Sequence, residues 1–257
     1  MVRARRVKPE DELTLVEHLD ELRTRIIVVL VVLTVAVAAC FYESGAILNF
    51  LADPLPHRPG HHYQFLAVSP LDGILTSISI AIYSGLLLTM PIATYQLYAF
   101  VIPAFAESYH GHIKPLVLMI PALFVAGVIF AWYLVVPPAI EFLVGFNDQA
   151  FNYQLRAKDY IQFVLLTLLA MGIVFEMPAV MLVLARLRIM SSALMRRHWR
   201  ISIVLLAVLA MLLPGVDPIS FIVEFVPLLA LYGLSYFIVV GVERAQGSDE
   251  PDPEPLT

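Results

Sequence analysis

Charged residues are scarce in this sequence, and cysteine is almost absent. Only 14% of the 257 residues are charged and 60% are hydrophobic, and the mean hydropathy is +0.83. A soluble domain is closer to half apolar and a quarter charged, so the composition excludes a soluble protein and indicates one that crosses a membrane several times. Cys40 is the single cysteine, which excludes an internal disulfide.

Catalytic motifs are also missing. The sequence has no P-loop, no H-E-x-x-H, no G-x-S-x-G and no Gly-rich dinucleotide fingerprint. Its histidines lack cysteines or carboxylates at ligand spacing. We therefore expect a protein that is not an enzyme and that holds no metal or cofactor.

What the sequence does have is six apolar stretches. They cover about residues 25–42, 71–100, 114–136, 160–184, 201–213 and 218–240. A membrane helix needs about 20 apolar residues, so the fifth stretch is short and fits a re-entrant segment as well as a crossing. Four stretches contain a proline, at Pro91, Pro121, Pro178 and Pro227, which favours a curved, concave helical bundle. The predicted fold is an all-α integral membrane protein with six transmembrane helices.

Basic residues predict the orientation. Of the 16 Lys and Arg residues, all but Arg58, Arg156 and Lys158 fall in alternate segments that include both chain ends. Because Lys and Arg concentrate in cytoplasmic loops, both termini are predicted to be cytoplasmic. We expect a cytoplasmic N-terminal segment (1–24), a membrane domain (25–240) and an acidic cytoplasmic tail (241–257) that is disordered.

The stretch "HLDELRTRI", residues 18–26, brings carboxylates to the cytoplasmic mouth of the first span. On a helix, Glu17, Glu21 and Arg25 share one face. One interpretation is an ordinary surface ion pair between Glu21 and Arg25. The other is an acidic face that receives a cationic ligand, for which arginine is suited because its guanidinium pairs with a carboxylate through two hydrogen bonds.

Two further acids lie inside predicted spans. Glu176, in "GIVFEMP", is deep in the fourth span, and Glu224 is in the sixth, nearer an end. An ionised side chain there costs at least ~2.5–3.5 kcal/mol, so Glu176 should face a cavity, a partner helix or water. Since Pro178 follows closely, we expect the helix to be kinked or unwound there. A proton-coupled secondary transporter that uses Glu176 is therefore an alternative function.

Several of these stretches together resemble one family. "HLDELRTRI" resembles the H-L-x-E-L-R-x-R entry motif of the TatC family, the signal receptor of the twin-arginine protein translocase. "MPIATYQLYAFVIPAF" (residues 90–105) resembles its second-span exit and first cytoplasmic loop, "GIVFEMP" its fourth-span F-E-x-P element, and "LLPGVDP" its last outer turn. The matches occur in family order from Leu15 to about Val240.

The resemblance implies six membrane helices in a concave, glove-like arrangement with both ends cytoplasmic, in a bacterial cytoplasmic membrane. It also implies binding of the paired-arginine signal peptides of folded precursors, self-association, and assembly with single-span TatA- and TatB-type subunits for export driven by the proton-motive force; nucleic acid is not an expected partner. The family positions matched in this sequence are Glu21, Arg23, Phe100 (placed in the cytoplasmic loop), Pro54, Leu55, Glu176 and Asp217.

This chain departs from the family pattern at three places. The family usually has a second signal-binding acid in the first cytoplasmic loop, and the aligned residue here is Tyr109. Either Glu107, two residues earlier, takes that role by a local shift, or Glu17 or Glu21 contributes more of the binding. Tyr98 replaces a tryptophan. Phe221 stands where some members have a polar partner-contact residue, for which Glu224 is a substitute one turn further on.

Overall fold

The computed structural model describes residues 15–55, 65–105, 113–145, 155–214 and 218–247. Within these ranges the chain is helical, and its only extended pairing is an isolated bridge between Leu66 and Arg156. The helices are α1 (Leu15–Tyr42), α2 (Ser44–Leu51), α3 (Asp72–Phe105), α4 (Ile113–Phe130), the π-helical turn η1 (Ala131–Val135), α5 (Val136–Gly145), α6 (Ala157–Val174), α7 (Met177–Arg186), α8 (Ser192–Arg197), α9 (Trp199–Leu212) and α10 (Pro218–Gly247).

Five helical segments of the described chain are long and apolar enough to cross a membrane. They are His18–Tyr42, Asp72–Val101, Met119–Gly145, Ala157–Arg186 and Pro218–Ala245. Each coincides with one of the predicted apolar stretches. The remaining stretch forms α9, whose 14 residues span about 21 Å, less than the ~30 Å hydrocarbon core. The all-helical, multi-span prediction is confirmed, whereas the sixth crossing stays a prediction.

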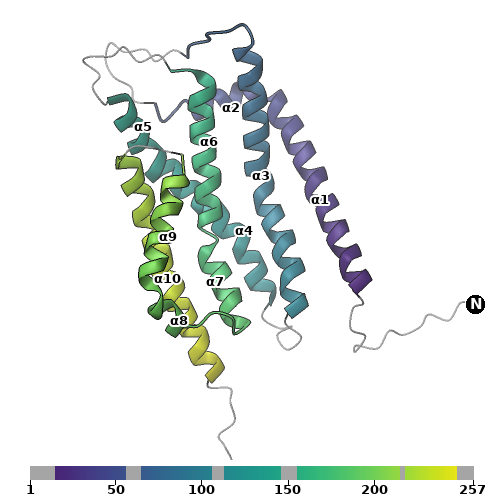
Figure 1. Cartoon of the computed structure of the whole chain (residues 1–257). Coiled ribbons are helices and arrows are strands. Elements are labelled where there is room, and N and C mark those ends of the chain that lie inside the picture. Colours follow the sequence, from purple (N-terminus) through teal and green to yellow (C-terminus); the bar gives the residue numbers. More distant parts are fainter. Residues whose placement is uncertain (1–14, 56–64, 106–112, 146–154, 215–217, 248–257) are drawn as a thin grey trace, which may run out of the picture.

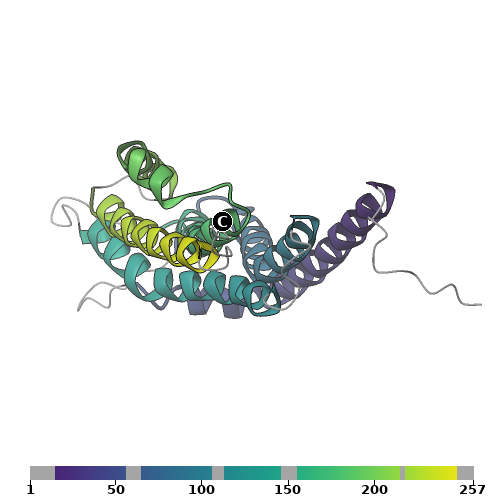
Figure 2. The same ribbon diagram turned by 90° about the horizontal axis from the view of Figure 1, so that it is seen from below.

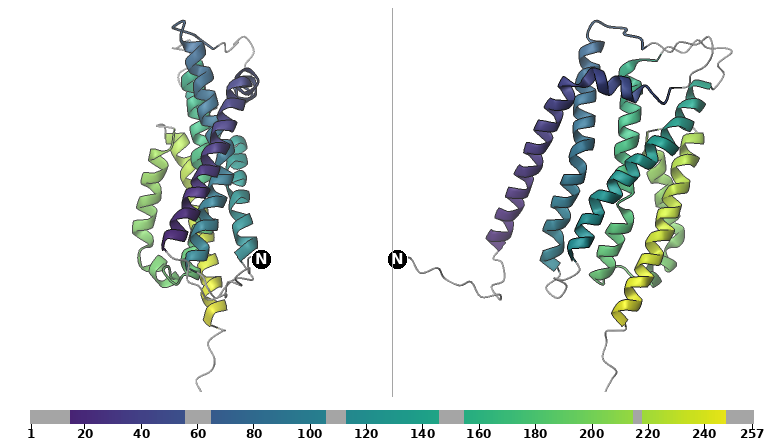
Figure 3. Two further views of the ribbon diagram at one scale, coloured as in Figure 1. Left: turned by 90° about the vertical axis from the view of Figure 1, so that its right-hand side faces the viewer. Right: turned by 180° about the vertical axis from the view of Figure 1, so that it is seen from behind.

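The long helices run between two ends of the molecule, called here the lower and upper ends as they stand in Figure 1. The start of α1 and the end of α10 both lie at the lower end, with α8 and the end of α3. The short helix α2 and the start of α6 lie at the upper end. Seen along the helices, the array is flattened and curved, with α1 at one edge (Figure 2), and Figure 3 shows its narrow profile.

Helix α6 is the centre of the packing because it contacts α3 on one side and α4 on another. Its buried residues include Val164, Leu165, Leu168 and Met171. A small residue permits the close approach of α4, since a Cβ added at Gly172 would lie 2.6 Å from the Phe124 ring. The central helices are thereby held rigidly together, while α1 packs mainly on α3.

Prolines interrupt the helices less often than the sequence predicts. The expected break before Pro178 is present, because α6 ends at Val174 and α7 begins at Met177. By contrast, α4 and α10 continue through Pro121 and Pro227. The third segment is longer than predicted, because it continues past residue 136 to Gly145. The π turn η1 has a backbone hydrogen bond from Val136 N–H to the carbonyl of Ala131. This turn accommodates the prolines that follow, so the helix does not end there.

Candidate functional site

A polar cluster lies at the lower end, where α1 meets α3. The Arg25 guanidinium donates to Oε1 of Glu21 from Nε (3.0 Å) and from Nη2 (2.5 Å). It also donates from Nη1 to Oε1 of Gln96 (2.9 Å) and from Nη2 to the carbonyl of Ala99 (3.3 Å). We call Glu21, Arg25, Gln96 and the Ala99 carbonyl the arginine cluster. It joins the carboxylate of α1 to the last turns of α3.

Helix geometry explains this cluster. Glu21 and Arg25 are one turn apart on α1, which brings their side chains together. A second contact between the two helices lies beside them: the His18 ring stacks on Phe100, with ring centroids 4.2 Å apart and an interplanar angle of 13°. Phe100 was expected in a loop, but α3 continues to Phe105, so its ring is fixed by a helix.

The cluster is open to solvent on one side. The side chains of Glu21 and Arg25 are 38% and 23% exposed, and Asp20 and Arg23 beside them are exposed. Both hydrogen bonds to Glu21 end on the same oxygen, Oε1. Among the described residues no donor reaches Oε2, so the carboxylate can accept a further donor from outside.

An apolar groove adjoins the cluster. A cavity of about 240 Å³ lies between α1 and α3 and is lined by Arg25, Gln96 and Phe100 together with aliphatic side chains, among them Leu22, Ile26, Val29 and Leu97. The arrangement thus offers a carboxylate for a cation and, directly beside it, an apolar surface. A ligand with a basic end followed by an apolar segment fits both.

Other predicted site residues are placed as follows. Glu17 is in the first turn of α1, but its side chain lies outside the described residues, as do Glu107, Tyr109 and Asp217. Leu55 is buried in the main core and Pro54 is half-buried; both follow α2 at the upper end, far from the arginine cluster.

The two acids within the spans are both buried. Glu176 occupies the turn between α6 and α7 and is 7% exposed. Its Oε1 finds no hydrogen-bond partner in the described part of the chain. Glu224 on α10 is 1% exposed, although it lies nearer the end of its span.

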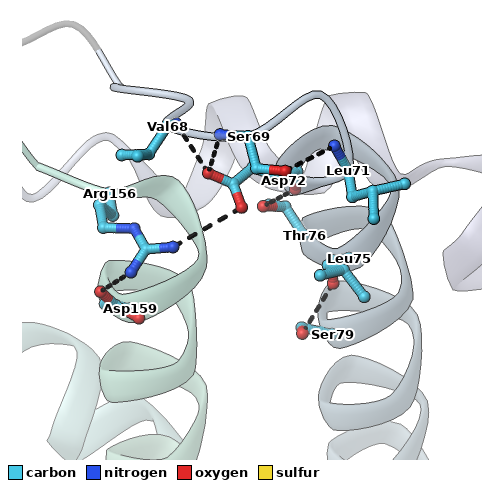
Figure 4. Close-up of polar contacts among 9 residues, drawn as sticks. All are labelled: Val68, Ser69, Leu71, Asp72, Leu75, Thr76, Ser79, Arg156 and Asp159. Carbon is cyan, nitrogen blue, oxygen red and sulfur yellow. Dashed lines mark hydrogen bonds and ion pairs between the residues drawn. The ribbon is translucent and has the colours of Figure 1, made fainter.

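A second polar cluster, at the upper end, was not singled out from the sequence. The Asp72 carboxylate accepts from the backbone N–H groups of Val68 (2.7 Å) and Ser69 (3.1 Å) and lies 3.6 Å from Arg156 (Figure 4). Nearby, the Tyr160 hydroxyl donates to the carbonyl of Leu51 (2.7 Å). These bonds tie α2, α3 and α6 together. In the sequence, Asp72 and Arg156 are isolated charges near the ends of two different apolar stretches, and their spacing does not predict an ion pair.

Comparison with known proteins agrees with this arrangement. A model of the family "Sec-independent protein translocase protein (TatC)" matches residues 17–227. A TatC protein from Synechocystis is 36% identical over 82% of this chain and 82% of its own length. One from Magnetococcus marinus is 30% identical over 94% of this chain and 89% of its own.

A solved structure has the same fold. The crystal structure titled "Twin Arginine Translocase Receptor- TatC" superposes with a TM-score of 0.77, at 29% identity, over 89% of this chain and 100% of that one. Relatives named as protein translocase components indicate a transport role and not catalysis. The chain is a multi-span membrane protein that belongs to the TatC family of Sec-independent protein translocases.

Proposed function

We propose that this protein is the receptor of a twin-arginine translocation system, which binds the paired-arginine signal peptides of folded precursors. Its family membership supports this proposal, as does the likeness to a structure titled as a receptor. The observation that carries it is the arginine cluster, in which the Glu21 carboxylate already holds a guanidinium and remains 38% exposed.

The groove beside the cluster supports the same ligand. A signal peptide has a basic region followed by an apolar region of 7–15 residues. In the proposed complex the arginines meet Glu21, with Glu17, Glu107 or Tyr109 as further contacts, and the apolar region follows the groove between α1 and α3. Arg23 and Phe100 flank the site, Arg23 as an exposed charge and Phe100 as part of the groove wall.

We propose six crossings, with α9 as the fifth in chain order, in a concave, glove-like array in a bacterial cytoplasmic membrane. The lower end, with the start of α1 and the end of α10, then faces the cytoplasm. The distribution of basic residues supports this orientation, because five arginines lie between α7 and the first turns of α9, at the lower end. The proposed division into 1–24, 25–240 and 241–257 follows, although α1 itself runs unbroken through residue 24. The prediction of a disordered tail from residue 241 is wrong for residues 241–247, because α10 continues as a helix to Gly247.

Single-span TatA- and TatB-type subunits are the proposed partners, together with further copies of this chain. Export would be driven by the proton-motive force. Glu176 and Glu224, which are both buried inside the spans, are the proposed intramembrane polar groups, and Glu224 is the proposed substitute for the family's polar partner-contact residue. Pro54, Leu55 and Asp217 are proposed to act in the outer loops.

The burial of Glu176, with one carboxylate oxygen lacking a partner in the described chain, also suits the alternative of a proton-coupled transporter. Proton flux by the reconstituted protein alone, without signal peptide or partner subunits, would favour that alternative. Flux that stays at the level of empty vesicles and of a Glu176→Gln variant would argue against it.

Site-specific photocrosslinking tests the receptor proposal. A photoreactive residue is placed at position 22, next to Glu21 in the groove wall, or at position 107 or 109 in native membranes, and a precursor signal peptide is added. We expect a crosslink at position 22 that disappears when both signal arginines are changed to lysine, or when Glu21 is changed to Gln. A probe at position 133, which is an exposed site on η1, serves as the control for non-specific labelling.

The two alternatives for the second contact are separated by the same experiment. Crosslinking at 107 but not 109 assigns the role to Glu107, and the reverse assigns the position to Tyr109. If position 22 labels the lysine peptide as strongly as the arginine peptide, the proposed recognition by Glu21 is wrong.

A further inference from the structure

A second cavity lies at the upper end, opposite the arginine cluster. Its volume is about 300 Å³, and it is formed by one face of α2, the segment before α3, and the first turns of α3 and α6. Its charged lining residues are Asp72, Arg156 and Lys158. Nothing in the receptor proposal uses this cavity.

The cavity is polar at the top and apolar below. On α3, Asp72, Thr76 and Ile80 follow one another at one-turn spacing along its wall. Thr76 is bonded to the carbonyl of Asp72, and Ile80 is 1% exposed. Leu48 of α2 extends the apolar part. Both α3 and α6 enter their apolar spans at this height, with spans beginning at residues 72 and 157, so the polar part lies at the level of lipid headgroups.

Its frame is built by several independent bonds. Leu66 N–H donates to the carbonyl of Leu155 (2.9 Å), which fixes the segment before α3 against the start of α6. The Asp72 carboxylate holds the same segment through two backbone N–H groups (Figure 4). The cavity is therefore a defined part of the fold.

The two cations of the cavity can still bind an anionic ligand. The ion pairs of Arg156 with Asp72 and Asp159 are 3.6 and 3.8 Å long, which is longer than the ~2.7–2.9 Å of a charge-assisted hydrogen bond. The guanidinium side chain is 47% exposed, and Lys158 contributes a second cation. The lining itself holds two cations and one carboxylate, while Asp159, the second partner of Arg156, lies outside the lining.

The distribution of basic residues in the whole chain makes two cations in one outer cavity unusual. Only Arg58, Arg156 and Lys158 fall outside the segments predicted to be cytoplasmic, and two of the three line this one cavity. Cations at the outer side oppose the usual bias. A specific anionic ligand accounts for their presence together.

We propose that this cavity binds the phosphodiester headgroup of one anionic phospholipid, with Arg156 and Lys158 on the phosphate and an acyl chain leaving along Leu48 and Ile80. Basic pockets between membrane helices are known to bind anionic headgroups on the cytoplasmic or matrix side, and this cavity has the same kind of lining at the opposite end. In the orientation proposed above, the lipid belongs to the outer leaflet. The bound lipid fills the space between α2, α3 and α6 and stabilises the upper end.

Native mass spectrometry of the full-length protein in detergent tests the proposal, with phosphatidylglycerol as the probe and phosphatidylcholine as the neutral comparison. We expect one phosphatidylglycerol per chain, held at least about tenfold more tightly than phosphatidylcholine. Lys158→Gln should weaken phosphatidylglycerol binding by about tenfold, because it removes one charged donor.

Matched controls separate binding from folding. Arg156→Gln should also weaken binding, but it removes the ion pair with Asp72, so Lys158→Gln is the deciding variant. Arg244→Gln removes an exposed arginine from the end of α10, at the lower end, and should leave binding unchanged. Lys158→Gln should melt at the same temperature as the wild-type protein without lipid.

Three results would overturn the proposal. Equal binding of phosphatidylcholine would remove the role of charge, and equal binding by Lys158→Gln and Arg244→Gln would place the lipid elsewhere. Displacement of phosphatidylglycerol by millimolar inorganic phosphate would identify a soluble anion as the ligand. Because no signal peptide is present, the outcome is independent of the receptor proposal.

Discussion

The contact between α1 and α3 depends on the absence of a side chain at Gly85. A Cβ added there would lie 2.6 Å from Cγ2 of Val37 and 2.9 Å from both the Cα and the N of Val37. Two of these three atoms belong to the backbone of α1 and cannot be moved by a change of rotamer. Gly85→Ala therefore requires the two helices to separate.

The size of the effect follows from packing. Non-bonded carbon atoms prefer separations of about 3.5–4.0 Å, so the helices must move apart by roughly 1 Å at this point. Overpacking of this kind costs about 1–3 kcal/mol. Because α1 packs on α3 and only slightly on α2, the displacement should fall on α1 and lengthen the bonds of the arginine cluster, which lies further down the same helix pair.

Thermal unfolding of the purified protein in detergent measures the loss of stability, and crosslinking of the signal peptide from position 22 measures the loss of the site. Both should fall for Gly85→Ala. The control is Gly233→Ala on α10, where an added Cβ meets nothing within 4 Å and the substitution should be neutral or stabilise the helix by about 0.5–1 kcal/mol. If both variants melt and crosslink like the wild-type protein, the packing argument is refuted.

Two further variants test other parts of the structure. Tyr160→Phe removes the buried hydrogen bond to the Leu51 carbonyl and should lower the free energy of unfolding by about 1–3 kcal/mol, whereas Tyr133→Phe, at a residue 70% exposed, should have little effect in the same melting experiment. Glu21→Lys should reduce precursor export more than Asp20→Lys, because the Glu21 carboxylate lies in the arginine cluster; equal losses in an export assay would contradict the role of Glu21.

The sequence was sufficient to predict contacts within one helix. Glu21 and Arg25 are one turn apart, so their pairing follows from helix geometry alone, and the break before Pro178 follows from its missing N–H. The other half of the arginine cluster was not predictable in this way. Gln96 is 71 residues away from Arg25 in the chain, and only the docking of α1 on α3 brings them together.

Burial across the bundle was the harder quantity to predict. Glu224, 1% exposed, and Glu176, 7% exposed, are both buried, although only Glu176 lies deep in its predicted span. Burial depends on which neighbours cover a face, here those around α10, and not on distance from the helix end. For the same reason Asp72 and Arg156, at the starts of two separate helices, gave no sign of their ion pair.

The flattened shape of the described helices has a consequence for the permeability of the membrane. They do not close into a ring (Figure 2), and both edges carry outward-facing aliphatic side chains, such as Leu30 on α1 and Leu205 on α9. Lipid can therefore seal against both edges, and the described helices of one copy enclose no aqueous route. If the protein acts in the proposed translocation system, a conduit wide enough for a folded protein needs walls from additional chains, and the protein alone should leave the membrane impermeable.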